Sequence, residues 1–143
     1  MATADDLLAV YLRRVEGKLG DKITSNSTLS DYARAEFGQD MFRGVFPSGQ
    51  APNDTAGSYF YVVNTEPVHD GHWMCVARVP GKQPLLFDSF GRTPSPHWQA
   101  HLQHMRTTDP DVDQASDTNR CGQLCLAWAM IFRDHGLDVA RAV

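Results

Sequence analysis

Hydrophobic residues recur at helical spacing near the start of the chain. Over residues 3–19 the apolar positions share one helical face, and Gly20 follows the last of them. The face consists of Leu7, Leu8, Tyr11, Leu12, Val15 and Leu19. A second, shorter helix is predicted over residues 30–37, with Ser30 at its start and Gly38 after its end.

Two further segments near the end of the chain have the same spacing. Residues 96–105 place three apolar side chains on one face, at Trp98, Leu102 and Met105. The last predicted helix runs from about Cys121 to Asp134 and ends at Gly136. Between them, residues 107–120 are polar and predict a loop.

The middle of the chain alternates with a period of two, which is typical of strands. Strands are predicted over residues 58–64, 72–79 and 84–88, and their short connections favour an antiparallel meander. Residues 41–46 alternate more weakly. In the second strand, one face holds Trp73, Cys75, Ala77 and Val79, and the other holds His72, Met74, Val76 and Arg78.

This order predicts a single α+β domain over residues 1–143. Its helical part covers residues 1–38 and its sheet residues 41–90; residues 94–143 add helices and a loop. We expect a central, mostly antiparallel sheet packed against the helices.

Composition narrows the class of protein. With 143 residues, 42% hydrophobic and 21% charged, the chain resembles an ordinary globular domain. The formal net charge of −4 excludes a strong basic field for nucleic acid. Arg13, Arg14 and Lys18 could contact phosphates, but so few cations on a helix usually form a solvated face.

The cysteines and the N-terminus indicate the compartment. An odd count of three cysteines does not make a disulfide framework and favours a reducing, intracellular location. No apolar run approaches the roughly 20 residues that span a bilayer. Asp5 and Asp6 stand where a signal peptide would carry positive charge, so neither export nor membrane insertion is expected.

Candidate chemistry centres on Cys121, at the start of the last predicted helix. Partial positive charge at a helix N-terminus favours the thiolate. A nucleophilic thiolate also needs a base, an orienting carboxylate and an oxyanion donor. His72 begins a strand and Asp88 ends the next, so these two should lie close together. Gln114 lies in the loop before Cys121 and could supply an amide donor.

Other interpretations remain open for these residues. Cys125 and Cys75 fit structural positions in the core better than reactive ones. Asp88 could simply form a turn. A zinc site is not expected, because residues three apart on a strand, such as His72 and Cys75, point to opposite faces. Packed or surface roles are expected for His69, His97, His101, His104 and His135.

The ordered motifs resemble the adenovirus-type cysteine proteases (adenains), distant relatives of the SUMO-specific proteases. The resemblance covers about residues 40–135 and rests on Gly71-His72-Trp73-Met74, Leu86-Phe87-Asp88-Ser89-Phe90-Gly91, Gln114 and Cys121-Gly122-Gln123-Leu124-Cys125. Gln114 precedes Cys121 by seven residues, as in the adenain branch.

The resemblance implies an adenain-like fold and a role for each residue. Cys121 would be the nucleophile and His72 the general base and acid. Asp88 would orient His72, where adenovirus enzymes often have Glu, and Gln114 would help to form the oxyanion hole. Trp73 and Gly122 would support the site or line the substrate groove.

The resemblance also implies substrates and a location. The family cleaves viral precursor proteins after glycine-containing motifs during particle maturation, in the host nucleus or assembly site and in the virion. Its peptide and DNA cofactors are not expected here, because no obvious attachment cysteine remains and the chain is acidic. Two alternatives stay open: an isopeptidase that removes ubiquitin-like modifiers, and an inactive, protease-derived binding module.

Overall fold

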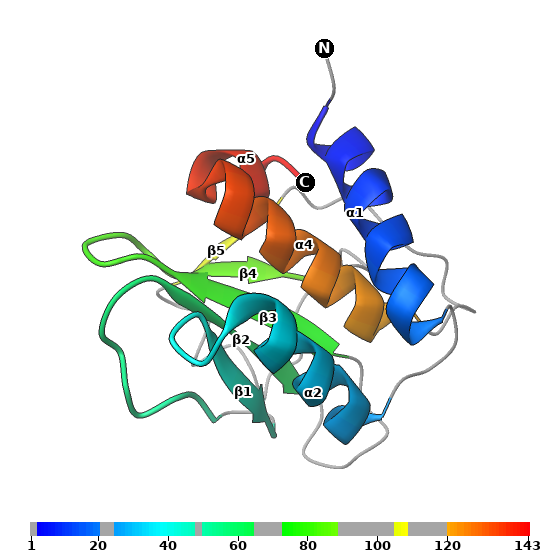
Figure 1. Cartoon of the computed structure of the whole chain (residues 1–143). Helices are drawn as coiled ribbons and strands as arrows, with labels where there is room; N and C mark the ends of the chain where they lie inside the picture. Colours follow the sequence, from blue (N-terminus) through cyan, green and yellow to red (C-terminus); the bar gives the residue numbers. More distant parts are fainter. Residues whose placement is uncertain (1–2, 21–24, 48–49, 65–72, 89–104, 109–119) are drawn as a thin grey trace.

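A five-stranded mixed sheet with helices on one face forms a single small α+β domain (Figure 1). The computed structural model describes residues 3–20, 25–47, 50–64, 73–88, 105–108 and 120–143. The predicted α+β class is therefore confirmed. No helix in these ranges is both long and apolar enough to span a membrane.

Local capping sets the two N-terminal helices. Helix α1 (Ala4–Leu19) begins with a capping box, in which Thr3 and Asp6 each accept a hydrogen bond from the other's backbone N–H. The predicted helix over residues 3–19 is confirmed to within one residue, because Thr3 caps it. Helix α2 (Asn26–Phe37) begins four residues before its predicted start, because Ser25 accepts a hydrogen bond from the Thr28 N–H.

The sheet order is β1-β2-β3-β4-β5. The predicted meander is confirmed: β2 (Tyr59–Asn64), β3 (Trp73–Arg78) and β4 (Leu85–Phe87) pair antiparallel. Both outer strands instead run parallel to their neighbours, β1 (Phe42–Phe46) to β2 and β5 (Arg106–Thr107) to β4.

The sheet is consequently mixed: its central pairings are antiparallel, as predicted, whereas its two outer pairings are parallel, which was not predicted. Two parallel neighbours begin at the same end of the sheet, so the chain must cross back over the sheet between them, which a tight hairpin cannot do. The connections before β2 and β5 are long enough for such a crossover.

The C-terminal part differs from the prediction in two places. Helix α4 (Cys121–His135) confirms the predicted helix, but Gly136 then leads into a short α5 (Leu137–Arg141). The Trp128 Nε1 donates to the Ala140 carbonyl at 2.9 Å, which fastens α5 onto α4. The predicted helix over 96–105 lies outside the described residues except for Met105, which is not helical and directly precedes β5.

The two faces of the sheet belong to two clusters of buried side chains. On the helical face, Cys75 and Ala77 pack with residues of α1, α2 and α4. On the other face, Met74 and Val76 pack with Tyr61 of β2. The predicted division of the β3 side chains is thus confirmed for the described residues. Every residue of α4 from Gly122 to Phe132 is buried, so this helix is the centre of the core.

A polar cluster joins α1 and α2 to the end of α4. The Tyr11 hydroxyl donates to Asp134 Oδ2 at 2.8 Å and lies 3.2 Å from His135 Nε2. Arg133 forms two ion pairs. Its Nε lies 2.8 Å from Asp134 Oδ1, and its Nη1 lies 3.1 Å from Oε1 of Glu36 in α2. The hydrogen bond from Arg133, helped by that from Tyr11, holds the pKa of the Asp134 carboxyl below its ordinary value.

Asp134→Asn should reduce the loss of stability in acid. A carboxyl whose pKa is depressed by folding stabilises the protein above its unfolded-state pKa of about 3.9, and this contribution disappears as the pH falls through the folded-state pKa. Because Asp134 is exposed and solvent screens its interactions, we expect the effect to be below about 1 kcal/mol. Urea unfolding between about pH 5 and pH 2 measures it. If the free energy of unfolding falls equally with decreasing pH in wild type and variant, the expectation is contradicted.

Candidate active site

Cys121 is the first residue of α4 and is partly exposed. The first hydrogen bond of the helix runs from the Leu124 N–H to the Arg120 carbonyl at 2.8 Å. The thiol therefore belongs to the turn where the helix dipole is positive, and this turn contains no acidic residue. Such a position favours a thiolate over a thiol.

Residues of α1 and α2 hold the start of α4 in place. The Gln123 side chain is fully buried, and its Nε2 donates to the Gly20 carbonyl, just after α1, at 3.1 Å. Arg120 forms an ion pair with Glu16 of α1, in which Arg120 Nη1 lies 3.6 Å from Glu16 Oε1. A Cβ atom added at Gly122 would lie 2.7 Å from Leu29 Cδ1 of α2. The turn that carries Cys121 is thus fixed by tertiary contacts.

The start of β3 lies against the same turn. A Cβ atom at Gly122 would also lie 2.7 Å from Cε3 of Trp73, so the indole ring sits directly on the glycine. The Cys125 thiol, one turn after Cys121, approaches the Trp73 carbonyl at 3.5 Å. His72 directly precedes Trp73 in the sequence. Both His72 and Gln114 lie outside the described residues.

Asp88 lies at this end of the sheet as well. It directly follows β4, whose last residue, Phe87, pairs with Cys75 near the start of β3. Burial raises the pKa of the Cys125 thiol well above its ordinary value, and electrostatic interaction with the titratable groups of Cys75, Cys121 and Asp88 raises the pKa further. Cys121 and Asp88 are therefore both electrostatic neighbours of one buried thiol.

The environment separates the three cysteines. Cys75 and Cys125 are buried, and burial raises the pKa of both thiols, which makes them poor nucleophiles at neutral pH. Cys121 is the one that solvent reaches. The predicted core positions of Cys75 and Cys125 are confirmed.

Candidate metal ligands do not cluster in the part of the chain that the structure describes. There, no three His, Cys, Asp or Glu side chains gather in a way that could hold a metal ion. Cys121 and Cys125 are separated by one helical turn and differ in exposure.

Several supporting residues were missed in the sequence. Gln123 was a detectable exception, since it is a polar residue inside an apolar helical run, which indicates a buried hydrogen bond. Leu29 and Glu16 carried no comparable signal, because helical spacing shows which face is buried but not which helix covers it.

Sequence comparison adds no relative to this description. The chain matches no protein-family model and no curated protein sequence.

Proposed function

We propose that the chain is a cysteine endopeptidase with an adenain-like fold, in which Cys121 is the nucleophile. The observation that carries this proposal is the partly exposed thiol at the N-terminus of a buried helix, with Trp73 and Asp88 at the same end of the sheet. His72, bonded to Trp73, is then the natural base for this thiol.

The proposed reaction proceeds in two steps. His72 takes the thiol proton, the Cys121 sulfur attacks the peptide carbonyl, and the C–N bond breaks as His72 returns the proton to the leaving amine. Water then attacks the carbonyl carbon of the thioester while His72 takes one of its protons, so that a C–O bond forms. The C–S bond breaks, the acid is released, and His72 returns the proton to the Cys121 sulfur. Asp88 orients the imidazole, while Gln114 and the Cys121 backbone N–H stabilise the oxyanion.

The proposed substrates are viral or virus-like structural precursor proteins, cleaved after glycine-containing motifs. The resemblance to adenains supports this assignment, with Trp73 and Gly122 beside the nucleophile as site-supporting residues. The proposed reaction uses no cofactor. Intracellular assembly sites and the virion are the proposed locations. Parallel incubation with conjugates of ubiquitin-like modifiers would distinguish an isopeptidase from an endopeptidase.

Alkylation of the native protein tests the nucleophile directly. Iodoacetamide at neutral pH should modify Cys121 faster than an unstructured cysteine peptide, because the helix N-terminus and an imidazole favour the thiolate. Mass mapping provides internal controls, since buried Cys75 and Cys125 should stay unmodified until the protein unfolds. If Cys121 reacts no faster than the free peptide, it is not an activated nucleophile.

Asp88→Asn should lower kcat by about 10²- to 10⁴-fold, because an amide neither stabilises the imidazolium nor enforces the same tautomer. Initial cleavage rates of a Gly-Gly peptide measure this loss. Asp31→Asn on α2 is the matched control, because Asp31 is an exposed aspartate whose side chain is 83% accessible. Equal rates for both variants would exclude Asp88 from the site.

A further inference from the structure

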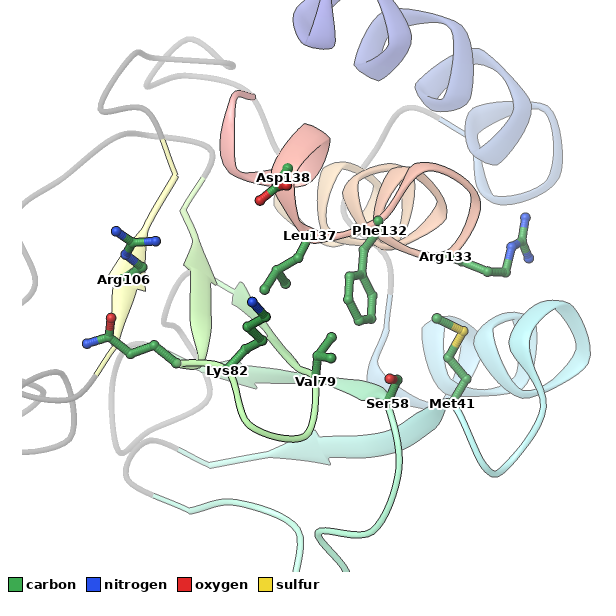
Figure 2. Close-up of a pocket in the computed structure, with 11 residues that line it drawn as sticks. Met41, Ser58, Val79, Lys82, Arg106, Phe132, Arg133, Leu137 and Asp138 are labelled. Carbon is green, nitrogen blue, oxygen red and sulfur yellow. The ribbon is translucent and has the colours of Figure 1, made fainter.

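A pocket of about 460 Å³ lies at the end of the domain away from Cys121 (Figure 2). It is formed by the turn between β3 and β4, the first residue of β5, and the junction of α4 with α5. Phe132, on its wall, follows Cys121 by eleven residues of continuous helix, which corresponds to roughly 16 Å along the axis. The pocket is therefore separate from the candidate active site.

One side of this pocket is apolar. Phe132 of α4 is only 5% exposed, and Leu137, Val79 and Met41 are half-buried beside it. In the view of Figure 2 the Phe132 ring points toward Val79, and the Leu137 side chain ends beside that of Lys82. A volume of this size suits a small ligand with one aromatic or branched aliphatic group.

The other side is basic. Lys82 in the β3–β4 turn and Arg106 of β5 line it, and neither forms an ion pair within the described residues. In the view of Figure 2 the Lys82 side chain extends toward Leu137 and lies between Arg106 and Phe132. Arg133 also lines the pocket, but Glu36 and Asp134 hold it.

The pocket also contains one acidic side chain, which lies across from Lys82. Asp138 of α5 stands beyond Leu137 from the Lys82 side (Figure 2). Two uncommitted cations thus face one carboxylate, although the whole chain has a formal net charge of −4. The local charge is opposite to that of the whole protein, so an anion bound here would be held by these side chains and not by the overall field.

We propose that this pocket binds a small organic acid, with its carboxylate at Lys82 and Arg106 and its apolar group against Phe132 and Leu137. Charge-assisted hydrogen bonds from two cations hold a carboxylate more strongly than neutral donors do. Burial of the apolar group beside them selects acids that carry an aromatic or branched chain. This binding does not depend on peptidase activity.

Three probes with one apolar group and different charge test the proposal: 4-phenylbutyrate, 4-phenylbutanol and 4-phenylbutylamine. Titration of the full chain, followed by backbone NMR shifts, should show shifts at Phe132 and Leu137. The acid should bind about ten-fold more tightly than the alcohol, and the amine most weakly. Equal binding of acid and alcohol, or no binding at millimolar acid, would overturn the proposal.

Charge-removing variants locate the carboxylate. The double variant Lys82→Gln/Arg106→Gln should bind the acid no better than the alcohol, whereas Asp138→Asn should bind the acid more tightly. Lys18→Gln, an exposed cation at the end of α1, is the matched control and should bind like the wild type. All substitutions are at exposed positions, and circular dichroism checks that each variant is folded. If Lys18→Gln weakens binding of the acid as much as the double variant does, the carboxylate is not bound at Lys82 and Arg106.

Discussion

Cys121→Ala should abolish cleavage of a Gly-Gly peptide, with a loss on the order of 10⁴-fold or more in kcat. The reason is that the proposed reaction passes through a covalent thioester, which alanine cannot form. Its methyl group fits the partly exposed position, so the fold should persist. Initial rates measured by mass spectrometry of the products, together with an unfolding curve, separate lost chemistry from lost structure.

Cys75→Ala is the matched control for the nucleophile. It removes a thiol from the buried middle of β3, where the raised pKa of the thiol already makes it a poor nucleophile. The variant should be less stable because it leaves a small cavity, yet it should cleave the peptide at nearly the wild-type rate below its unfolding transition. If Cys121→Ala retained more than a small fraction of the rate while Cys75→Ala lost it, the assignment of Cys121 would be wrong.

Gly122→Ala should lower the free energy of unfolding by about 1–3 kcal/mol, which is the usual cost of overpacking a core. The added methyl would meet Leu29 Cδ1 and Trp73 Cε3, each at 2.7 Å, and Trp73 Cζ3 at 2.8 Å. These atoms belong to α2 and β3, which other buried residues hold, so the neighbours cannot all retreat. We also expect slower peptide cleavage, because displacement of Trp73 displaces the residue bonded to it, His72. Urea denaturation and initial rates measure the two effects.

Gly17→Ala is the matched control for this steric prediction. Gly17 is also helical, but a Cβ atom there meets nothing within 4 Å. Alanine should therefore stabilise α1 by up to about 1 kcal/mol through its better helix propensity. A Gly122→Ala variant that is as stable as Gly17→Ala would show that α4 and β3 do not pack as closely as described.

A double-mutant cycle can identify which neighbour resists the methyl group. Leu29→Ala alone should cost about 2–5 kcal/mol, because it opens a cavity in the core. Combined with Gly122→Ala, the total loss should be smaller than the sum of the two, since the new methyl occupies part of that cavity. Strict additivity would assign the whole steric effect to Trp73.

Local sequence signals determined α1, α4 and the three central strands. Each is long or regular enough for periodicity to show, and each ends at a clear signal such as Gly20 or Gly136. The predicted start of α2 at Ser30 was wrong, because the helix is capped by Ser25 and Ser30 lies within it. Helix α5 is too short, at five residues, for periodicity to reveal it.

The candidate site was only partly readable from the sequence. The position of Cys121 at a helix start follows from polar residues before it and apolar residues after it, and this local pattern is confirmed. Asp88 at the end of a strand beside β3 follows from the meander and is likewise confirmed. The roles of these residues in catalysis stay predictions, as do those of His72 and Gln114, which lie outside the described residues.

Local sequence pattern was enough to predict α1, α4 and the three central strands, the apolar face of each, and which cysteine begins a helix. These properties depend on the spacing of residues close together in the chain. The parallel pairing of β1 and β5 with their neighbours, and the meeting of Leu29 and Trp73 at Gly122, depend on the folded structure. Only it brought Lys82 and Arg106 to the rim of one pocket. Contacts of this kind join residues far apart in sequence, and many partners of similar size and polarity satisfy the same local pattern until the whole core packs.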